Sequence, residues 1–401
     1  MPDRLADLCA VHAGQRPDGI AVRFGGHDLT WQALHLRSQA LAGWLWHDAG
    51  VRAGDRVALL LALARIGSIL VPLNFRLAPA EWDAVWRDCT PVAVLHDAAW
   101  QEAATALAQR HGAASWPVEA LGAEGSTLAP EDARTSIQAA TTPALLVYTS
   151  GTTGTPKGAV HTQGQLLANM GAACAVQQLT PGDTVLTVLP LFHVGGLCIQ
   201  TLPALAAGAT VLLHHRFEPQ AMLQALAADR PTLTLVVPAV MKALVDHPAW
   251  ATADLSSLRA VWAGSSTLPA ALVDAFHARG LPVCNVYGAT ETGWVTMLHP
   301  HEQFTKLGSV GRECVGAAPI RILDEAGNEV ADGQAGELYS CNAHTFDCYW
   351  RQPDKTREAF RGEYCSVGDM ARRDEDGYIH LSDRKSNMII SGGENIYPSE
   401  V

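Results

Sequence analysis

One stretch of the sequence decides the fold: Ala144-Leu-Leu-Val-Tyr148-Thr-Ser-Gly-Thr-Thr-Gly-Thr-Pro-Lys157-Gly158. Its apolar start predicts a buried strand, and a loop rich in glycine and hydroxyl side chains follows at once. Glycines let the backbone bend and expose consecutive N–H groups, hydroxyls donate to phosphate oxygens, and Lys157 adds a positive charge. The stretch therefore predicts an α/β protein that binds a polyphosphate.

This loop differs from two common phosphate loops. A Walker A loop needs Ser or Thr after its Lys, whereas Gly158 follows Lys157 and Pro156 precedes it. The G-x-G-x-x-G spacing is also absent. A plain Ser/Thr/Gly linker would not be expected directly after a core strand, so we interpret the loop as a dedicated phosphate site.

Composition excludes several other classes. The chain has 401 residues and a formal net charge of -12, which disfavours a nucleic-acid-binding protein. None of its nine cysteines forms a C-x-x-C pair, so we expect reduced thiols, no zinc site and a cytoplasmic protein. No signal peptide or membrane helix is predicted. The sequence leaves open whether the chain forms a homodimer.

Strand-like and helical patterns alternate over most of the chain, which predicts a doubly wound, mostly parallel sheet. Expected strands are 92–95, 144–148, 184–189, 210–213, 233–237, 260–263 and 283–287, and expected helices are 79–88, 163–176, 196–206, 219–228, 239–245 and 268–279. Short strands with glycine turns (319–324, 337–340 and 378–381) then predict a small β-rich subdomain. We divide the chain into residues 1–307, 308–383 and 384–401.

The segment 55–70 is unusual. We expect a strand over 55–61 and a helix over 63–70, yet no turn residue separates them before Gly67. A buried strand normally reaches a helix through a short surface loop. Either a natural deletion has removed this loop or a loop is missing from the sequence, and we favour the missing loop.

Three later segments carry further binding chemistry. They are Leu189-Pro-Leu-Phe192-His193-Val194-Gly195-Gly196, Asn285-Val-Tyr287-Gly288-Ala289-Thr290-Glu291-Thr-Gly293 and Tyr364-Cys-Ser-Val-Gly368-Asp369. A flat Tyr287 can stack on adenine, Thr290 can donate to a phosphate, and Glu291 can hold Mg²⁺ with phosphate oxygens. The same Thr and Glu would equally suit a capped helix start, and on this segment alone both interpretations stay open.

Together with the loop at 149–158, these segments resemble the adenylate-forming superfamily, which includes acyl-CoA synthetases, peptide-synthetase adenylation domains and firefly-type luciferases. The segment from Asp383 to Pro398 resembles the hinge of that family, with Ser386 where Asp or Lys is usual. Val367 replaces the Thr of the family's T-G-D segment. The resemblance covers essentially the whole chain.

The resemblance implies a role for each matching residue. ATP would be held by Thr149, Ser150, Gly151, Thr152, Thr153, Gly154, Lys157, Tyr287, Gly288, Thr290, Asp369 and Arg384. Glu291 and Thr152 would hold Mg²⁺, and the catalytic residues would be Thr290, Glu291, His193 and Lys157. The acid would lie against His193, Val194, Gly195, Pro238, Gly264, Ser265, Ser266, Gly288 and Ala289.

The implied reaction has two steps. A carboxylate attacks the α-phosphorus of ATP to give acyl-AMP and pyrophosphate, and the thiol of coenzyme A then displaces AMP. A carboxylate is already a nucleophile at pH 7, so the first step needs positioning and charge neutralisation more than acid–base catalysis. The pocket residues are mostly small and apolar, which favours an aryl or medium-chain fatty acid.

The chain stops at Val401, where the family continues into a small C-terminal domain that carries a catalytic Lys. No position matches that Lys, so we expect this domain to be absent and adenylation by the chain to be poor. Two alternatives remain: an adenylation domain that loads a carrier protein, and a non-catalytic nucleotide-binding protein.

Overall fold

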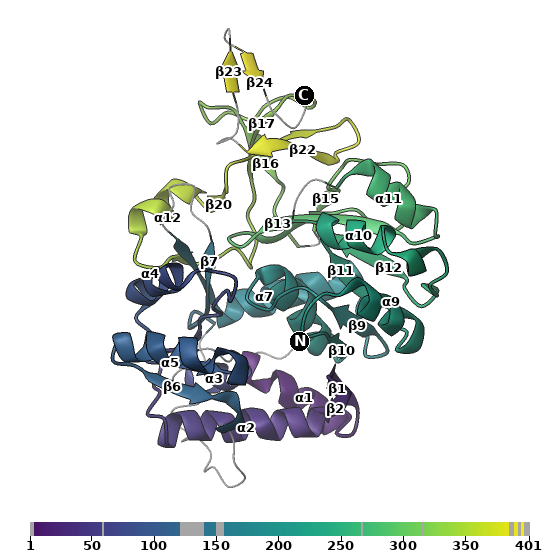
Figure 1. Cartoon of the computed structure of the whole chain (residues 1–401). Coiled ribbons are helices and arrows are strands. Elements are labelled where there is room, and N and C mark those ends of the chain that lie inside the picture. The colour runs from purple at the N-terminus through teal and green to yellow at the C-terminus, as the bar shows by residue number, and fades with distance from the viewer. Residues whose placement is uncertain are drawn as a thin grey trace.

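The computed structural model describes residues 4–57, 60–120, 140–149, 156–265, 268–314, 316–384, 389–391 and 394–396. It is an α/β protein with a large mixed sheet, a second mixed sheet and a small antiparallel sheet (Figure 1). This architecture agrees with the predicted fold class. Among the helices of the described ranges, none has the length and apolar character needed to cross a membrane.

The largest sheet has the order β15–β14–β13–β12–β11–β9–β10–β1–β2. Its strands are β1 (Ile20–Phe24), β2 (His27–Thr30), β9 (Thr184–Thr187), β10 (Thr210–Leu213), β11 (Leu233–Val236), β12 (Ala260–Ala263), β13 (Val283–Ala289), β14 (Gly293–Met297) and β15 (Arg312–Glu313). The strands from β13 to β1 are parallel, and the edge strands β2, β14 and β15 are antiparallel. The prediction of a mostly parallel sheet is confirmed.

Strand β12 shows why this sheet is covered on both faces. Trp262 belongs to one buried cluster, and its neighbours Val261 and Ala263 belong to another. Because successive side chains of a strand point to opposite faces, both faces must be covered by helices. Helices α9, α10 and α11 supply one cover through Met222, Met241 and Phe276, for example, and α1, α2, α7 and α8 supply the other.

The helices are α1 (Leu8–Gln15), α2 (Trp31–His47), α3 (Leu60–Ile66), α4 (Pro79–Cys89), α5 (Gln101–Arg110), α7 (Gln163–Gln177), α8 (Leu202–Ala207), α9 (Pro219–Ala228), α10 (Pro238–Val245), α11 (Ala270–His277) and α12 (Pro353–Ala359). Residues Gly195–Thr201 form a π-helical turn before α8. Thr30 caps α2, because its hydroxyl accepts a hydrogen bond from the Ala33 N–H.

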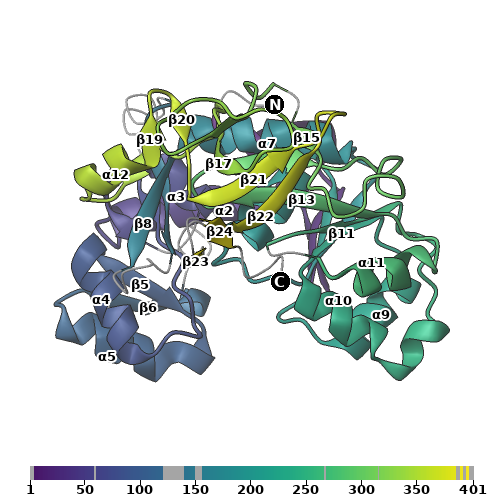
Figure 2. The ribbon, with the colours of Figure 1, turned by 90° about the horizontal axis from the view of Figure 1, so that it is seen from above.

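The second sheet has the order β18–β8–β7–β4–β3. Its strands are β3 (Arg56–Val57), β4 (Ile69–Leu70), β7 (Pro143–Thr149), β8 (Lys157–Thr162) and β18 (Cys348–Tyr349). Beside it, β5 (Ala93–His96) and β6 (Ala114–Pro117) form a parallel pair with α4 and α5. Seen from above, the α4–α5 lobe lies on one side of the molecule and α9, α10 and α11 on the other (Figure 2).

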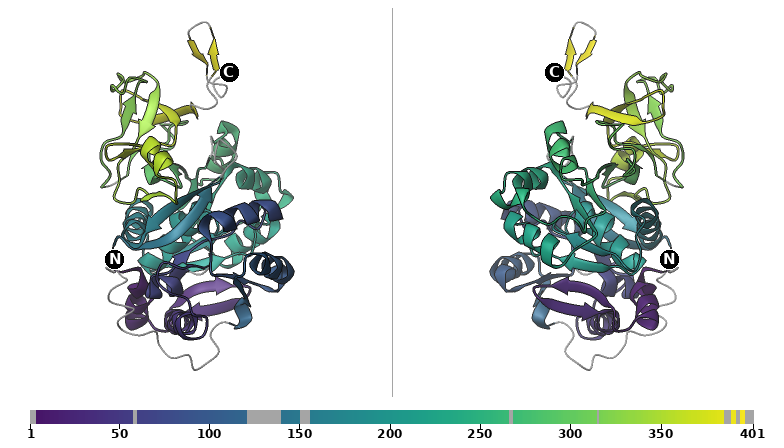
Figure 3. Two further views of the ribbon diagram at one scale, coloured as in Figure 1. Left: turned by 90° about the vertical axis from the view of Figure 1, so that its left-hand side faces the viewer. Right: turned by 90° about the vertical axis from the view of Figure 1, so that its right-hand side faces the viewer.

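The β-rich part forms an antiparallel sheet in the order β16–β17–β21–β22. Its strands are β16 (Arg321–Leu323), β17 (Gly336–Tyr339), β21 (Asp369–Arg373) and β22 (Ile379–Arg384), with the small pairs β19 (Phe360–Arg361)–β20 (Tyr364–Cys365) and β23 (Ile389–Ser391)–β24 (Glu394–Ile396). The β23–β24 pair projects at the end of the molecule opposite α2 (Figure 3).

The boundaries predicted for residues 55–70 were wrong. The strand β3 ends at Val57, and α3 spans Leu60–Ile66 instead of 63–70. A second strand, β4, follows at Ile69–Leu70. An apolar run rich in Leu and Ala has no clear period, so tertiary packing decides between strand and helix there.

Candidate active site

The phosphate loop joins two antiparallel strands. β7 ends at Thr149 and β8 begins at Lys157, and these two residues are partners in the strand register. Gly158 is closely packed, because a Cβ atom there would lie 2.7 Å from Leu146 Cδ1 and 3.1 Å from Tyr148 Cζ. The hairpin thus fixes both ends of the loop. Ser150, Gly151, Thr152, Thr153 and Gly154 lie outside the described residues.

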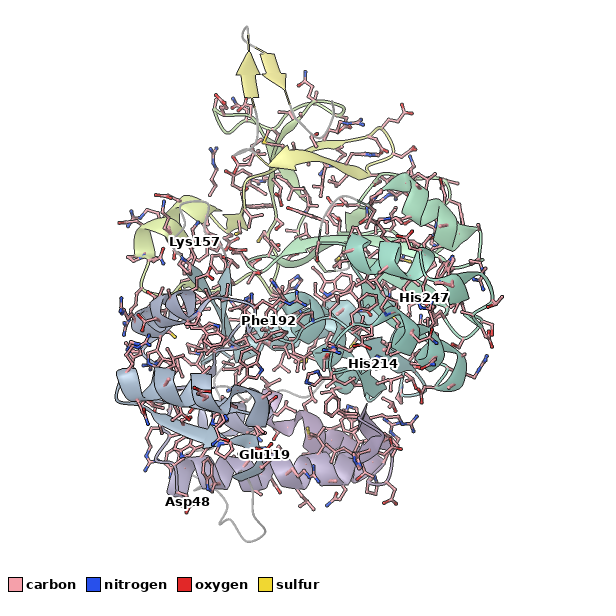
Figure 4. All side chains as sticks on the ribbon, viewed as in Figure 1. Asp48, Glu119, Lys157, Phe192, His214 and His247 are labelled. Atoms are coloured by element: carbon pink, nitrogen blue, oxygen red, sulfur yellow. The ribbon has the colours of Figure 1, made fainter. Side chains whose placement is uncertain are left out.

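A cavity of about 1710 Å³ opens beside this hairpin. Drug-sized ligands occupy pockets of roughly 300–1,000 Å³, so this cavity has room for a nucleotide and a second small molecule together. The predicted site residues that line it are Thr149, Lys157, His193, Val194, Gly195, Gly264, Ser265, Tyr287, Gly288, Thr290, Glu291 and Ala289. In the view of Figure 4, Phe192 lies between Lys157 and His214, and all three line this cavity.

A turn between β13 and β14 carries Thr290 and Glu291 into the cavity. Two glycines make the turn possible: a Cβ on Gly288 would lie 1.9 Å from the Gly293 carbonyl oxygen, and Gly293 has a φ of +60°. Thr292 closes the turn, since its hydroxyl accepts a hydrogen bond of 2.9 Å from the Ala289 N–H. The sequence Gly288-Ala-Thr-Glu-Thr-Gly293 is therefore a turn between strands and not the start of a helix.

Tyr349 of β18 holds the carboxylate of Glu291. The Tyr349 hydroxyl donates to Glu291 Oε1 at 2.7 Å, and Glu291 is only 7% exposed. The Lys157 Nζ atom lies 5.1 Å from the centre of the Tyr349 ring. Burial and the neighbouring Glu291 carboxylate raise the pKa of Tyr349, so it stays a hydrogen-bond donor. Tyr349 thus contacts both Lys157, the candidate phosphate-binding lysine, and Glu291, the candidate metal ligand.

On another side of the cavity, the lining residue Tyr287 contacts Asp369, which is not itself among the lining residues. The Tyr287 hydroxyl donates to Asp369 Oδ2 at 2.8 Å, although the two residues are 82 positions apart. Asp369 starts β21, where its partner in the strand register is Arg384 of β22. Tyr287 and Asp369, two of the residues predicted to hold ATP, therefore meet where the main sheet joins the β-rich part, and the backbone of Arg384 pairs with that of Asp369.

His193 lies in the segment between β9 and the π-helical turn. The segment packs closely, because a Cβ on Gly196 would lie 2.5 Å from the Pro190 carbonyl oxygen. Burial lowers the pKa of His193, and the nearby Arg76 guanidinium lowers it further. His193 is therefore expected to be neutral at pH 7, and it borders the cavity beside Phe192.

Five predicted positions have a different outcome. Asp369 is not among the residues that line the cavity, although its hydrogen-bond partner Tyr287 is, and the side chain of Arg384 lies outside the described part of the chain. Pro238 is not among the residues that line the cavity, although Val237 and Ala239 are, because Pro238 is the first residue of α10. Ser266 and the hinge position Ser386 lie outside the described residues.

The sequence did not point to Tyr349, Phe75, Arg76 or Trp100, which all line the cavity. Each comes from a segment without a recognisable pattern and reaches the site through long-range packing. The available signals were weak: Tyr349 precedes another aromatic residue, Trp350, and Trp100 follows the strand predicted at 92–95.

Comparison with known proteins decides the family. The model of the family described as AMP-binding enzyme matches residues 9–350. The chain belongs to the AMP-binding enzyme family.

Similar proteins of this family are ligases that form CoA thioesters. Indoleacetate–CoA ligase from Aromatoleum aromaticum is 37% identical over 99% of this chain and 81% of its own length. Feruloyl-CoA synthase from Amycolatopsis is 37% identical over 97% of this chain and 80% of its own length. The solved structure of O-succinylbenzoate CoA synthetase from Bacillus subtilis with ATP and magnesium has a TM-score of 0.88 at 27% identity, covering 98% of this chain and 83% of that one.

This AMP-binding enzyme is an AMP-forming acid–CoA ligase that uses ATP, Mg²⁺ and coenzyme A. It activates a carboxylic acid as an acyl adenylate and then forms the CoA thioester. The resemblance to adenylate-forming enzymes is thereby confirmed, and so are the predicted fold class, enzyme class and cofactors. The chain spans about four-fifths of the length of these three similar proteins, 80–83%.

Proposed function

We propose that this AMP-binding enzyme activates an aromatic carboxylic acid, in the cavity that His193 and Lys157 share. The observation that supports this most is the aromatic wall of the cavity, where Phe192 stands next to His193 at a ring distance of 5.1 Å. The relatives named for indoleacetate and ferulate are 37% identical to this chain, against 29% for a long-chain fatty acid ligase from Mycobacterium tuberculosis.

Each part of the cavity has a proposed task. The phosphate loop 149–157 and Lys157 bind the β- and γ-phosphates, and Thr290 donates to the α-phosphate. Tyr287 and Asp369 bind adenosine, and Arg384 pairs with Asp369 in the strand register. His193 borders the acid. Since the acid is already ionised at pH 7, these residues act by holding its oxygen in line with the α-phosphorus.

Glu291 fits a magnesium site. It is a carboxylate at the cavity wall, fixed by Tyr349, and Mg²⁺ is usually bound by one or two carboxylates plus phosphate oxygens. Thr152 of the phosphate loop would add a hydroxyl. When bound, the ion neutralises charge on the phosphates.

A panel of acids scored by pyrophosphate release tests this proposal. Phenylacetate, indoleacetate and ferulate should give higher kcat/KM than hexanoate and octanoate, and the product should be the CoA thioester. A higher kcat/KM for the aliphatic acids would contradict the aromatic assignment.

The second candidate function is transfer to a carrier protein. It is favoured by the 30% identity to a fatty acid–acyl-carrier-protein ligase from Streptomyces coeruleorubidus. Comparing AMP formation with free CoA and with a phosphopantetheinylated carrier domain separates the two acceptors.

A further inference from the structure

A row of aromatic rings crosses the cavity from one lobe to the other. Phe192 contacts Phe75 at a ring distance of 5.3 Å and an angle of 85°, and Phe75 contacts Trp100 at 5.9 Å. Phe75 lies between β4 and α4, and Trp100 ends the short helical turn before α5. The N-terminal lobe, which is the part of the chain that carries α4 and α5, therefore supplies the wall that faces His193 and Phe192.

These two rings are unusually exposed. Phe75 is 45% exposed and Trp100 is 38% exposed, and both line the same cavity. Exposed aromatic surface gathered inside a concave site is typical of a ligand-binding surface. The apolar faces of Phe75 and Trp100 are thus available to a flat ligand.

Trp82 of α4 supports the row of aromatic rings by packing against Trp100. Trp82 of α4 packs edge-on against Trp100 at 5.7 Å, and its indole N–H donates to the Asn74 carbonyl at 2.8 Å. Asn74 in turn accepts a hydrogen bond from the Arg76 N–H, which shapes the turn that presents Phe75. A preorganised aromatic surface loses little entropy when a ligand binds.

A cation lies beside these rings. The Arg76 guanidinium carbon is 5.6 Å from the Phe75 ring centre and 5.9 Å from the Phe192 ring centre. A guanidinium is attracted to the face of an aromatic ring, and it would attract an aromatic ligand in the same way. A saturated ring or an alkyl chain has no such face.

We propose that Phe75 and Trp100 are specificity-determining residues that stack on the aromatic ring of the acid. The inference rests on the proposed aromatic substrate. The acid lies with its carboxylate at His193 and Thr290 and with its ring directed toward the N-terminal lobe. Specificity for an aromatic acid is then set by a segment, residues 74–100, that precedes every motif of the active site.

The test compares phenylacetate with cyclohexylacetate, which has similar size and the same carboxylate but no π face. The variants are Phe75→Leu and Trp100→Leu, which keep an apolar side chain and remove the ring. The matched control is Phe304→Leu, because Phe304 is a 53% exposed ring that does not line the cavity. Thermal melting of each variant shows whether the fold is retained.

Each ring variant should raise KM for phenylacetate about 3- to 10-fold relative to KM for cyclohexylacetate, the size of effect that one ring contact supplies. KM for ATP and the melting curve of Phe75→Leu should stay as in the wild type, and Phe304→Leu should change nothing. Phe75 decides the outcome if Trp100→Leu melts early, since Trp100 also packs on Trp82.

If Phe75→Leu leaves the ratio of the two KM values unchanged, the inference about Phe75 and Trp100 is overturned. The proposed substrate class survives that result as long as the wild type is active with phenylacetate. A wild type that forms no thioester from any aromatic acid would refute the proposed substrate class and the inference with it.

Discussion

Replacing Tyr349 with phenylalanine removes the hydroxyl that holds Glu291 and keeps the ring that faces Lys157. In the lost hydrogen bond, the Tyr349 hydroxyl donates to Glu291 Oε1 at 2.7 Å, and Glu291 is only 7% exposed. Hydrogen bonds to charged groups contribute about 1.5–3 kcal/mol. If that energy serves to position Glu291, kcat/KM for MgATP should fall by about 10- to 150-fold, at about 1.4 kcal/mol per factor of ten.

The assay is pyrophosphate release at varied MgATP and at varied free Mg²⁺. Tyr349→Phe should raise the Mg²⁺ concentration needed for half-maximal rate and leave KM for the acid within a factor of about two, because His193 and the aromatic wall are untouched. Tyr349→Leu should lower kcat/KM for MgATP about 2- to 5-fold more than Tyr349→Phe does, since it also removes the ring contact with Lys157.

Tyr378→Phe is the matched control. The Tyr378 hydroxyl donates to Glu302 Oε1 at 2.8 Å, and neither residue lines the cavity. This variant loses the same kind of hydrogen bond and should keep wild-type values for MgATP. The reasoning is refuted if Tyr349→Phe has wild-type Mg²⁺ dependence while Glu291→Gln does not.

Three further predictions concern stability, the active-site turn and the ribose. Burial, with a smaller contribution from His344, lowers the pKa of His161 from 6.5 to about 4. As pH falls, the unfolded chain therefore binds the proton before the folded protein does, and this favours unfolding. Urea melts should show that the free energy of unfolding falls by about 2 kcal/mol between pH 7 and pH 5 because of His161, whose contribution is complete only above pH 6.5. His161→Gln should flatten this dependence; an equally steep profile would contradict the assignment. Gly288→Ala should abolish MgATP binding in calorimetry, because its Cβ would meet the Gly293 carbonyl, whereas Gly171→Ala in α7 has open space and should bind normally. Asp369→Ala should lose the preference for ATP over 2′-deoxy-ATP, measured as a ratio of kcat/KM; a preserved ratio would remove Asp369 from the ribose site.

Much of the fold could be predicted because apolar runs and turn residues mark its parallel strands. The strand expected at 210–213 is confirmed, and so is the helix at 219–228. The antiparallel strands expected at 319–324, 337–340 and 378–381 are found as β16, β17 and β22. The antiparallel pair of β8 and β18 was missed, because β8 follows a polar loop and β18 comes much later in the chain. Short strands paired over such distances leave little local signal.

The residues that carry local patterns were placed together by the structure. Lys157, His193 and Glu291 line one cavity, although they come from three separate segments. Tyr349 could not be predicted to reach Glu291, because the two side chains meet only through packing of β18 against β8. Likewise the row from Phe192 to Phe75 depends on how two lobes meet, which no single stretch of sequence encodes.

The most direct test of the central claim follows the oxygen atoms of the acid. The enzyme is given ATP, CoA and phenylacetate labelled with ¹⁸O in both carboxylate positions, and the products are analysed by mass spectrometry. Attack of the carboxylate on the α-phosphorus, followed by displacement of AMP by the thiol, predicts one ¹⁸O in AMP and one in the thioester carbonyl. Label in inorganic phosphate with formation of ADP, or AMP free of label, would contradict it.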